Sequence, residues 1–129
     1  MKTIAFSKTS NKRVVLDLPE LELPEGKITA VIGPNGSGKS TFAKVLSGIE
    51  AADDRRAILT GVSVGYLPQK SFPFRMSTEK NILQNGNDPA RAASLMKTLG
   101  IGALAGQSAK KLSGGETARM ALCRMLMRP

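Results

Sequence analysis

The sequence contains no histidine and no tryptophan, and its single cysteine is Cys123. Neither an internal disulfide nor a Cys/His zinc site can therefore form. A free cysteine in a helical pattern usually packs as a small hydrophobe, and we predict that role for Cys123. No apolar run approaches the roughly 18 residues of a membrane span, and no signal-peptide segment follows Met1. These absences predict a soluble, cytoplasmic chain.

Acidic and aromatic residues are also scarce. Ten Asp and Glu stand against 19 Lys and Arg, which gives a formal net charge of +9. Such an excess favours a polyanionic partner. However, the basic residues are scattered, and one Tyr, four Phe and no Trp offer little surface for stacking on bases. We therefore expect no nucleic-acid partner.

The residues that are present indicate one ordinary domain, with 129 residues of which 41% are hydrophobic. In the first part of the chain, short runs of β-branched residues and leucine predict strands near residues 3–7, 13–17 and 20–23, followed by a turn at 24–26. Residues 27–32, KITAVI, are more continuously apolar, as in a strand that is buried on both faces.

Apolar periodicity and capping residues predict helices in the rest of the chain. The first covers residues 40–49, and a strand over residues 58–67 separates it from the others. Ser77 and Asp88 are placed to cap two further helices. The glycine-containing segment 102–111 is predicted to be flexible.

A glycine-rich loop lies between the predicted strand over residues 27–32 and the helix that follows. Residues 33–40, GPNGSGKS, fit the pattern G-x-x-x-x-G-K-S/T in the strand–loop–helix context that this pattern requires. Polyphosphate must be wrapped by backbone N–H groups, so the turn needs glycines, and the helix points its positive end at the phosphates. Lys39 would reach the β- and γ-phosphates, and Ser40 would offer its hydroxyl to Mg²⁺. The predicted nucleotide-binding residues are Gly33, Pro34, Asn35, Gly36, Ser37, Gly38, Lys39, Ser40 and Thr41.

A second glycine turn precedes the last helix, which Pro129 is predicted to end. Residues 112–115, LSGG, place a serine hydroxyl and two unhindered amides at the positive end of that helix. By itself the stretch also fits a plain serine-capped helix after a Gly-Gly turn. As a phosphate-recognising element it adds Ser113, Gly114 and Gly115 as nucleotide-binding candidates. The predicted buried face of this helix comprises Ala118, Ala121, Leu122, Met125 and Leu126.

Together with the intervening GYLPQ, these elements make the chain resemble the ATP-binding cassette (ABC) family. Three motifs match in the order of that family: Walker A at residues 33–41, the Q-loop at 66–69 and the signature at 112–116. The resemblance implies an α/β P-loop NTPase fold, with a RecA-like core, a peripheral antiparallel β-subdomain and an α-helical subdomain. The implied domain ranges are 1–70 for the β-subdomain and the Walker A part of the core, 71–112 for the helical subdomain, and 113–129 for the signature helix.

The resemblance also implies roles for these residues. ATP and Mg²⁺ would be the cofactors, and the signature would contact the γ-phosphate of ATP on a second cassette in a head-to-tail dimer. Lys39 and Gln69 would be catalytic, with Ser40 and Gln69 holding Mg²⁺. A transmembrane permease subunit would be the transport partner, and residues 71–75, which carry Phe72 and Phe74, would lie beside the groove that receives it.

Some family features are missing from this sequence. Residues 7–13 contain no aromatic residue to stack on adenine, which leaves selectivity between ATP and GTP open, and we expect Phe6 to point into the sheet. The family's Asp-Glu strand after the signature helix and its later histidine are absent. Asp17 precedes the glycine loop, and Asp53 and Asp54 read as solvated charges, so none of the three is assigned to a metal. We therefore predict a C-terminally truncated fragment without appreciable hydrolysis of its own.

The favoured interpretation is the ATP-binding subunit of an ABC transporter, which in complete form hydrolyses ATP to power transport through a separate membrane subunit. Such a subunit would lie in the cytoplasm, held at the inner face of the cell membrane by its permease partner. One alternative is a non-transport ABC ATPase, such as a ribosome-associated translation factor, which the basic charge slightly favours. The other is a non-catalytic nucleotide-binding or partner-binding module.

Overall fold

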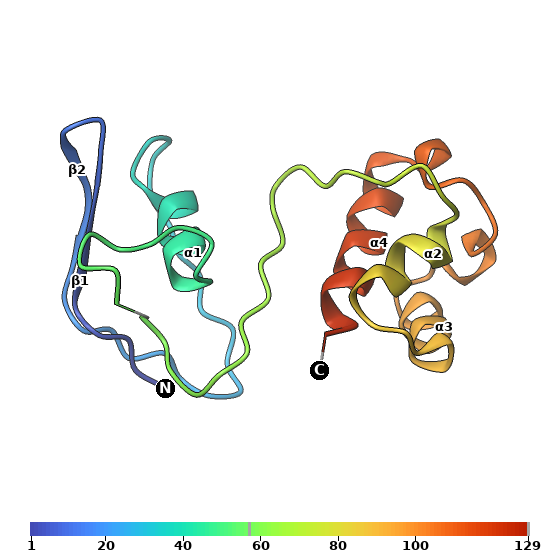
Figure 1. Ribbon diagram of the computed structural model, residues 1–129, viewed down its shortest axis with the longest axis horizontal. Coiled ribbons are helices and arrows are strands. Elements are labelled where there is room, and N and C mark those ends of the chain that lie inside the picture. Colours follow the sequence, from blue (N-terminus) through green and yellow to red (C-terminus); the bar gives the residue numbers. More distant parts are fainter. Residues whose placement is uncertain (57, 129) are drawn as a thin grey trace. The chain divides into compact units, whose positions relative to one another are not determined.

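The computed structural model describes residues 1–56 and 58–128 of the chain (Figure 1). It divides into two compact units, Met1–Tyr66 and Leu67–Pro129, and each unit has its own hydrophobic core. Within the described ranges, no helix combines the length and the apolar character that crossing a bilayer requires. The helix end predicted at Pro129 lies outside the described residues.

The first unit begins with an antiparallel hairpin of two strands, β1 (Phe6–Ser10) and β2 (Arg13–Leu18). The two residues between the strands, Asn11 and Lys12, both have positive φ, 49° and 62°. Two such residues in succession give the turn whose twist matches that of the flanking strands. The hairpin therefore forms with a tight connection although no glycine is present in it.

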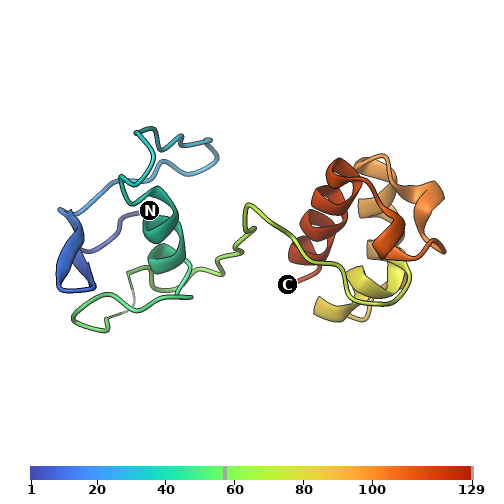
Figure 2. The same ribbon diagram turned by 90° about the horizontal axis from the view of Figure 1, so that it is seen from above.

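Helix α1 (Lys39–Leu46) packs against this hairpin (Figure 2). The ring of Phe6, which is 4% exposed, stacks on Phe42 with ring centroids 6.3 Å apart, so the expectation that Phe6 points inward is confirmed. The helix ends before Gly48, and Ile49 is 57% exposed rather than part of its apolar face. The core of this unit comprises Phe6, Leu16, Phe42, Val45, Ala52 and Ile58.

The strand predictions in this unit were only partly correct. Strand β2 matches the prediction, but the first strand lies at Phe6–Ser10 instead of residues 3–7. Residues 20–23 contribute only an isolated bridge between Glu22 and Lys2. The turn that follows, predicted at 24–26, is present at residues 25–26.

The predictions of strands over residues 27–32 and 58–67 were wrong. Ile28 and Ile32 are 101% and 92% exposed, and neither segment joins a ladder within the described residues. A strand buried on both faces needs neighbours that pair its N–H and C=O groups, and among the described residues the sheet consists of β1 and β2. An apolar cavity of about 330 Å³ lies beside residues 31–34 and is lined partly by Leu16, Leu18 and Phe42.

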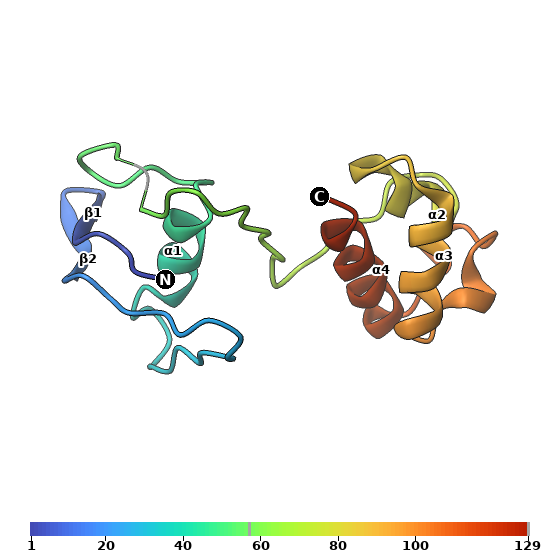
Figure 3. The same cartoon turned by 90° about the horizontal axis from the view of Figure 1, so that it is seen from below.

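The second unit is helical and contains α2 (Thr78–Ile82), α3 (Pro89–Thr98) and α4 (Gly114–Leu126). Figure 3 shows α2 and α3 packed with α4. Short 3₁₀ helices lie at Leu83–Asn85, Gly102–Leu104 and Ala109–Lys111. The core of this unit comprises Ile82, Ala92, Met96, Ile101, Ala109, Met120, Cys123 and Met127.

Both predicted caps are confirmed. The Ser77 hydroxyl accepts a hydrogen bond from the Lys80 amide at 3.3 Å, and the Asp88 carboxylate accepts one from the Arg91 amide at 2.9 Å. In contrast, segment 102–111 is more regular than predicted, because it forms two 3₁₀ helices and buries Ala109 in the core.

The buried face of α4 only partly matches the predicted face. Ala121 is buried as predicted, and Leu122 and Met125 are half-buried, whereas Ala118 and Leu126 are exposed. Met120 and Cys123, which the prediction did not include, are buried. Cys123 is 0% exposed, as expected of a small hydrophobe, and burial raises the pKa of its thiol.

Candidate nucleotide-binding site

The glycine loop at residues 33–40 runs from the extended segment 27–32 into α1. Gly36 and Gly38 have φ values of 83° and 88°, in the region that favours glycine. A Cβ atom on Gly38 would lie 2.8 Å from Cδ2 of Leu16 and 3.1 Å from the Val15 carbonyl oxygen. A side chain at Gly38 would therefore push the loop away from β2.

Lys39 closes the loop on itself. Its Nζ donates hydrogen bonds to the carbonyl oxygens of Gly33 and Pro34, both at 2.7 Å, and lies 3.5 Å from Oγ of Ser37. The ammonium therefore sits within the turn of the loop. A positive charge held there attracts an anion to the same place.

The first turn of α1 adds further donors. The N-cap is Gly38, which has no side chain to bond the first amides, and no acidic residue stands in the first turn. The initial N–H groups of a helix lack intrahelical partners and carry the positive end of its dipole. Ser40 is exposed and Thr41 is half-buried in this turn. Together with Lys39, these groups form a site suited to phosphate.

The geometry of the glycine loop and of the first turn of α1 suits a nucleotide polyphosphate together with Mg²⁺. A Cβ on Gly33 would lie 2.7 Å from Oγ of Ser37, so a side chain there would require the Ser37 hydroxyl to rotate away. The described residues contain no group of three or more His, Cys, Asp or Glu that could hold a metal ion. From the loop, Ser40 would hold Mg²⁺ beside water and phosphate oxygens, which are this ion's usual ligands at phosphate sites. Gln69 stays the second predicted ligand.

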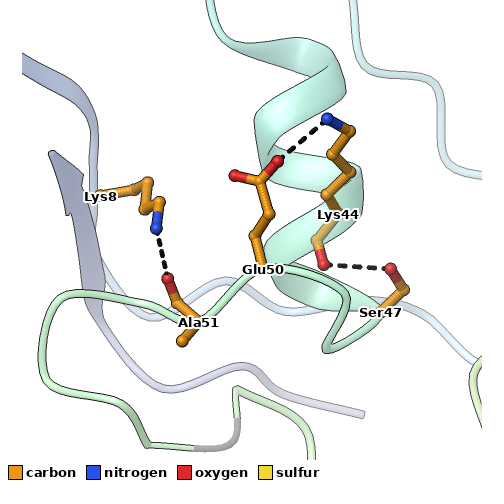
Figure 4. A network of polar contacts seen from close by, with 5 residues as sticks. All are labelled: Lys8, Lys44, Ser47, Glu50 and Ala51. Carbon is orange, nitrogen blue, oxygen red and sulfur yellow. Dashed lines mark hydrogen bonds and ion pairs between the residues drawn. The ribbon is translucent and has the colours of Figure 1, made fainter. Parts of the chain in front are cut away.

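The segment that follows α1 is attached to both α1 and β1 (Figure 4). The Lys44 ammonium pairs with Glu50 at 2.9 Å, and the Lys8 ammonium donates to the Ala51 carbonyl at 2.7 Å. These contacts connect α1, the helix that begins in the glycine loop, to the hairpin through residues 50 and 51.

Asp53 has a structural role that the sequence analysis missed. Its carboxylate accepts hydrogen bonds from the Thr9 amide at 2.9 Å and from the Thr9 hydroxyl at 2.8 Å, so it is not merely a solvated charge. The bond from the Thr9 backbone is the main cause of a lowered pKa of Asp53. Asp54 is likewise bonded, to Arg56. No short-range signal links Asp53 to Thr9, which is 44 residues away.

Gln69 and the signature residues belong to the second unit, whereas the glycine loop belongs to the first. Gln69 is exposed. Ser113 and Glu116 form a reciprocal capping box at the start of α4, in which the Ser113 amide donates to the Glu116 carboxylate at 2.8 Å. This bond is the main cause of a lowered pKa of Glu116. The catalytic and phosphate-binding roles of Gln69, Ser113, Gly114 and Gly115 stay predictions.

The loop before α2 contains two contacts that the sequence did not indicate. The side chain of Asn81, which is 0% exposed, accepts a hydrogen bond from the Phe74 amide at 2.8 Å and donates one to the Phe74 carbonyl at 3.2 Å. The guanidinium carbon of Arg124 lies 5.2 Å from the centroid of the Phe74 ring, and its Nη2 is 3.5 Å from the Phe72 carbonyl oxygen. Nη1 of Arg124 is buried without a hydrogen-bond partner among the described residues.

Comparison with known proteins identifies the family to which the chain belongs. The sequence model of the family described as "ABC transporter" matches residues 16–129. The chain belongs to the ABC transporter family. The match contains the whole glycine loop, Gln69 and the signature of this ABC chain.

Two curated relatives are ATP-binding proteins of uptake systems. The tungstate uptake system ATP-binding protein TupC of Peptoclostridium acidaminophilum is 35% identical over 141 aligned residues, which cover 94% of this chain and 64% of that protein. The zinc import ATP-binding protein ZnuC of Vibrio vulnificus (strain YJ016) is 36% identical, with 95% of this chain and 49% of that protein covered. This ABC chain thus spans about half to two thirds of the length of these relatives.

Solved structures agree on the fold. A chain in the complex of archaeal ribosomal stalk protein aP1 and archaeal ribosome recycling factor aABCE1 matches with a TM-score of 0.76 and 28% identity, covering 100% of this ABC chain and 26% of that chain. The predicted fold class, the P-loop NTPase fold of the ABC ATPase domain, is therefore confirmed.

Proposed function

We propose that this chain is the nucleotide-binding part of an ABC transporter subunit that hydrolyses ATP to power transport through a separate membrane subunit. The observation that carries the proposal is the Lys39 ammonium held inside the glycine loop at the open end of α1. The ATP-binding proteins TupC and ZnuC support a role in uptake.

Each residue of the loop has a distinct task in this function. The backbone amides of residues 36–40 and of the first turn of α1 would bind the phosphates, in a turn that Gly36 and Gly38 make possible through their positive φ values. Lys39, whose ammonium bonds the Gly33 and Pro34 carbonyls, would reach the β- and γ-phosphates. Ser40 would offer its hydroxyl to Mg²⁺, which would supply positive charge beside the phosphates.

We also infer that the second unit provides the groups that act around the γ-phosphate. Gln69 would hold Mg²⁺ and orient the attacking water within its own cassette. Ser113, Gly114 and Gly115 would contact the γ-phosphate in a second cassette, in a head-to-tail dimer. Gly114 and Gly115 are exposed and leave open space where a Cβ would be, which suits close approach by another molecule.

The membrane subunit is the remaining partner in this proposal. It would hold the ABC subunit in the cytoplasm, against the inner face of the membrane. Phe72 and Phe74 are 75% and 52% exposed, so they do not fill the local core and are available to a partner. The domain ranges 1–70, 71–112 and 113–129 form part of the same proposal.

Nucleotide binding by the purified chain tests the proposal. Lys39→Ala should weaken binding of a fluorescent ATP analogue in the presence of Mg²⁺ by at least about tenfold, because charge-assisted hydrogen bonds to phosphate are lost. Lys27→Ala removes an exposed lysine outside the loop and serves as the matched control. Equal affinity of both variants would refute the assigned site.

We further propose that these 129 residues bind nucleotide without turning it over appreciably, because the sequence lacks the Asp-Glu strand and the histidine that the ABC resemblance implies for hydrolysis. Phosphate release by the purified chain that disappears in Lys39→Ala would contradict this.

The second candidate is a non-transport ABC ATPase that acts with the ribosome. The likeness to a structure containing an archaeal ribosome recycling factor favours it, together with the net charge of +9. Co-sedimentation with ribosomes separates the candidates, because a transporter subunit should remain in the supernatant at physiological salt. A non-catalytic binding module remains the third candidate, for which stoichiometric nucleotide binding without turnover is also expected.

A further inference from the structure

The sequence contains two Asn-Gly pairs, Asn35–Gly36 in the glycine loop and Asn85–Gly86 at the end of a 3₁₀ helix. In such a pair the amide nitrogen of the glycine can attack the asparagine side chain, because glycine has no Cβ to block the approach. We propose that Asn35 is a site of non-enzymatic deamidation, that Asn85 is protected from the same reaction, and that the product at residue 35 weakens nucleotide binding. The last part rests on the proposed function, whereas the reactivity of Asn35 does not.

The reaction at Asn35 needs water and no other reactant. The Gly36 nitrogen forms a bond to Cγ of Asn35, the bond from Cγ to Nδ2 breaks, and the Gly36 N–H proton leaves with Nδ2 as ammonia. Water then opens the cyclic imide. Cleavage between the nitrogen and Cγ gives aspartate, and cleavage between the nitrogen and the main-chain carbonyl carbon gives isoaspartate. Both products carry an ionised carboxylate where the neutral amide was.

The structure leaves the reacting groups of the first pair free. Asn35 and Gly36 are both exposed, at the tip of a turn that the Ser37 amide closes by donating to the Pro34 carbonyl at 3.3 Å. A Cβ on Gly36 would meet nothing within 4 Å. Among the hydrogen bonds of residues 1–56 and 58–128, none involves the Asn35 side chain or the Gly36 amide. In this part of the chain, no hydrogen bond has to break before the ring can form.

The second pair is held through the same groups that the reaction requires. Nδ2 of Asn85 donates to the Arg124 carbonyl at 3.0 Å, and the Gly86 amide donates to the Leu83 carbonyl at 3.3 Å. Both residues are half-buried, and a Cβ on Gly86 would lie 2.7 Å from the Met127 carbonyl oxygen. Ring formation at Asn85 therefore requires local opening of the second unit, and its rate is reduced by the small population of the opened state.

A carboxylate at residue 35 opposes the function proposed for the glycine loop. The Lys39 ammonium donates to the carbonyl of Pro34, the residue before Asn35, at 2.7 Å. A negative charge at residue 35 would compete with phosphate for this ammonium and would repel the phosphate oxygens. Isoaspartate would also add a methylene group to the main chain and so displace the amides that follow it. Bound nucleotide should in turn slow the reaction, because a Gly36 amide that donates to phosphate is not available for attack.

The first experiment follows both pairs in the complete 129-residue chain during incubation at mildly alkaline pH. Trypsin releases Asn35 within residues 28–39 and Asn85 within residues 81–91, so fragment masses from one digest report both sites. We expect Asn35 to be converted at least about tenfold faster than Asn85 in the folded chain. In guanidinium chloride, where the contacts of both pairs are lost, the two rates should agree within about threefold.

The second experiment measures binding of a fluorescent ATP analogue with Mg²⁺ before and after the incubation. The affinity of wild type should fall in proportion to conversion at residue 35, and Asn35→Asp should bind about three- to tenfold more weakly than fresh wild type. Asn35→Ser cannot form the imide, so its own starting affinity should not decline during the incubation. Asn85→Ser changes the protected pair, and its affinity should decline as that of wild type does. Saturating analogue should slow conversion of Asn35 without changing the rate at Asn85.

Equal conversion of Asn35 and Asn85 in the folded chain would overturn the proposal. A difference in rate that persists unchanged in guanidinium chloride would do the same, because the local sequence and not the structure would then cause it. Undiminished affinity of fully converted wild type, in a chain that binds the analogue when fresh, would refute the effect on nucleotide binding. If the fresh chain does not bind the analogue, the proposed function fails while a measured difference between the two pairs stands, so the two failures are distinguishable.

Discussion

At the scale of single residues, Gly38 has two separate reasons to be glycine. Its φ of 88° disfavours any side chain, and a Cβ would approach Leu16 and Val15. Gly38→Ala should destabilise the first unit by about 1–3 kcal/mol and weaken nucleotide binding, as measured by thermal unfolding and by titration. Gly26→Ala has a similar φ of 65° but meets nothing within 4 Å. If Gly38→Ala and Gly26→Ala lose the same stability and nucleotide affinity, the contact with β2 does not cause the loss in Gly38→Ala.

The hydrogen bonds of Asp53 predict how the stability of the first unit depends on pH. Hydrogen bonds from Thr9 lower its pKa, so its contribution to stability is present above the ordinary aspartate value of 3.8 and is lost as the pH falls through the lower folded-state pKa. The unfolding temperature of wild type should exceed that of Asp53→Asn near neutral pH, and the difference should shrink in acid below the ordinary value. Asp17→Asn is the control, because Asp17 is exposed in β2 and its carboxylate has no hydrogen bond among the described residues. If the difference in unfolding temperature between wild type and Asp53→Asn is the same at all pH values, the ionised carboxylate of Asp53 does not stabilise the fold.

At the scale of elements, segment 27–32 is apolar in sequence and unpaired in the structure. Ile28 and Ile32 are almost fully exposed, and an exposed strand-forming segment invites pairing with another chain. Replacing both with lysine should reduce self-association of the purified chain, as measured by light scattering. Val14→Lys changes an exposed hydrophobe of the paired strand β2 and should have less effect. If Val14→Lys reduces self-association as much as the double lysine variant does, exposed hydrophobicity and not the unpaired backbone of segment 27–32 drives it.

The elements also show what sequence can predict. The caps at Ser77 and Asp88 were predictable because each depends on a bond three residues away. The same holds for the glycine loop, whose geometry depends on its own glycines and Lys39. The strands predicted at 27–32 and 58–67 do not form among the described residues, because a ladder depends on a partner elsewhere in the chain. The face of α4 was partly mispredicted, because Ala118 and Met120 are both apolar and only packing against other helices decides between them.

At the scale of the whole molecule, family and fold were predictable from three short motifs, while the contacts around them were not. Thr9 and Asp53, or Phe74 and Arg124, are joined by contacts over long separations that no local pattern announces. The roles of Gln69 and of the signature depend on groups beyond a single phosphate loop, and they stay predictions. Each unit has its own hydrophobic core, so a substitution in one core should first destabilise the unit that contains it.

The contact between Gly38 and β2 also has an evolutionary meaning. Because Leu16 and Val15 lie where a Cβ on Gly38 would be, a larger side chain in the hairpin should displace the glycine loop. If the loop binds nucleotide as proposed, selection on that binding should extend to residues that belong to no recognised motif. Sequence drift at Val15 and Leu16 should be confined to side chains that leave the same space above Gly38, even where the rest of the hairpin varies freely.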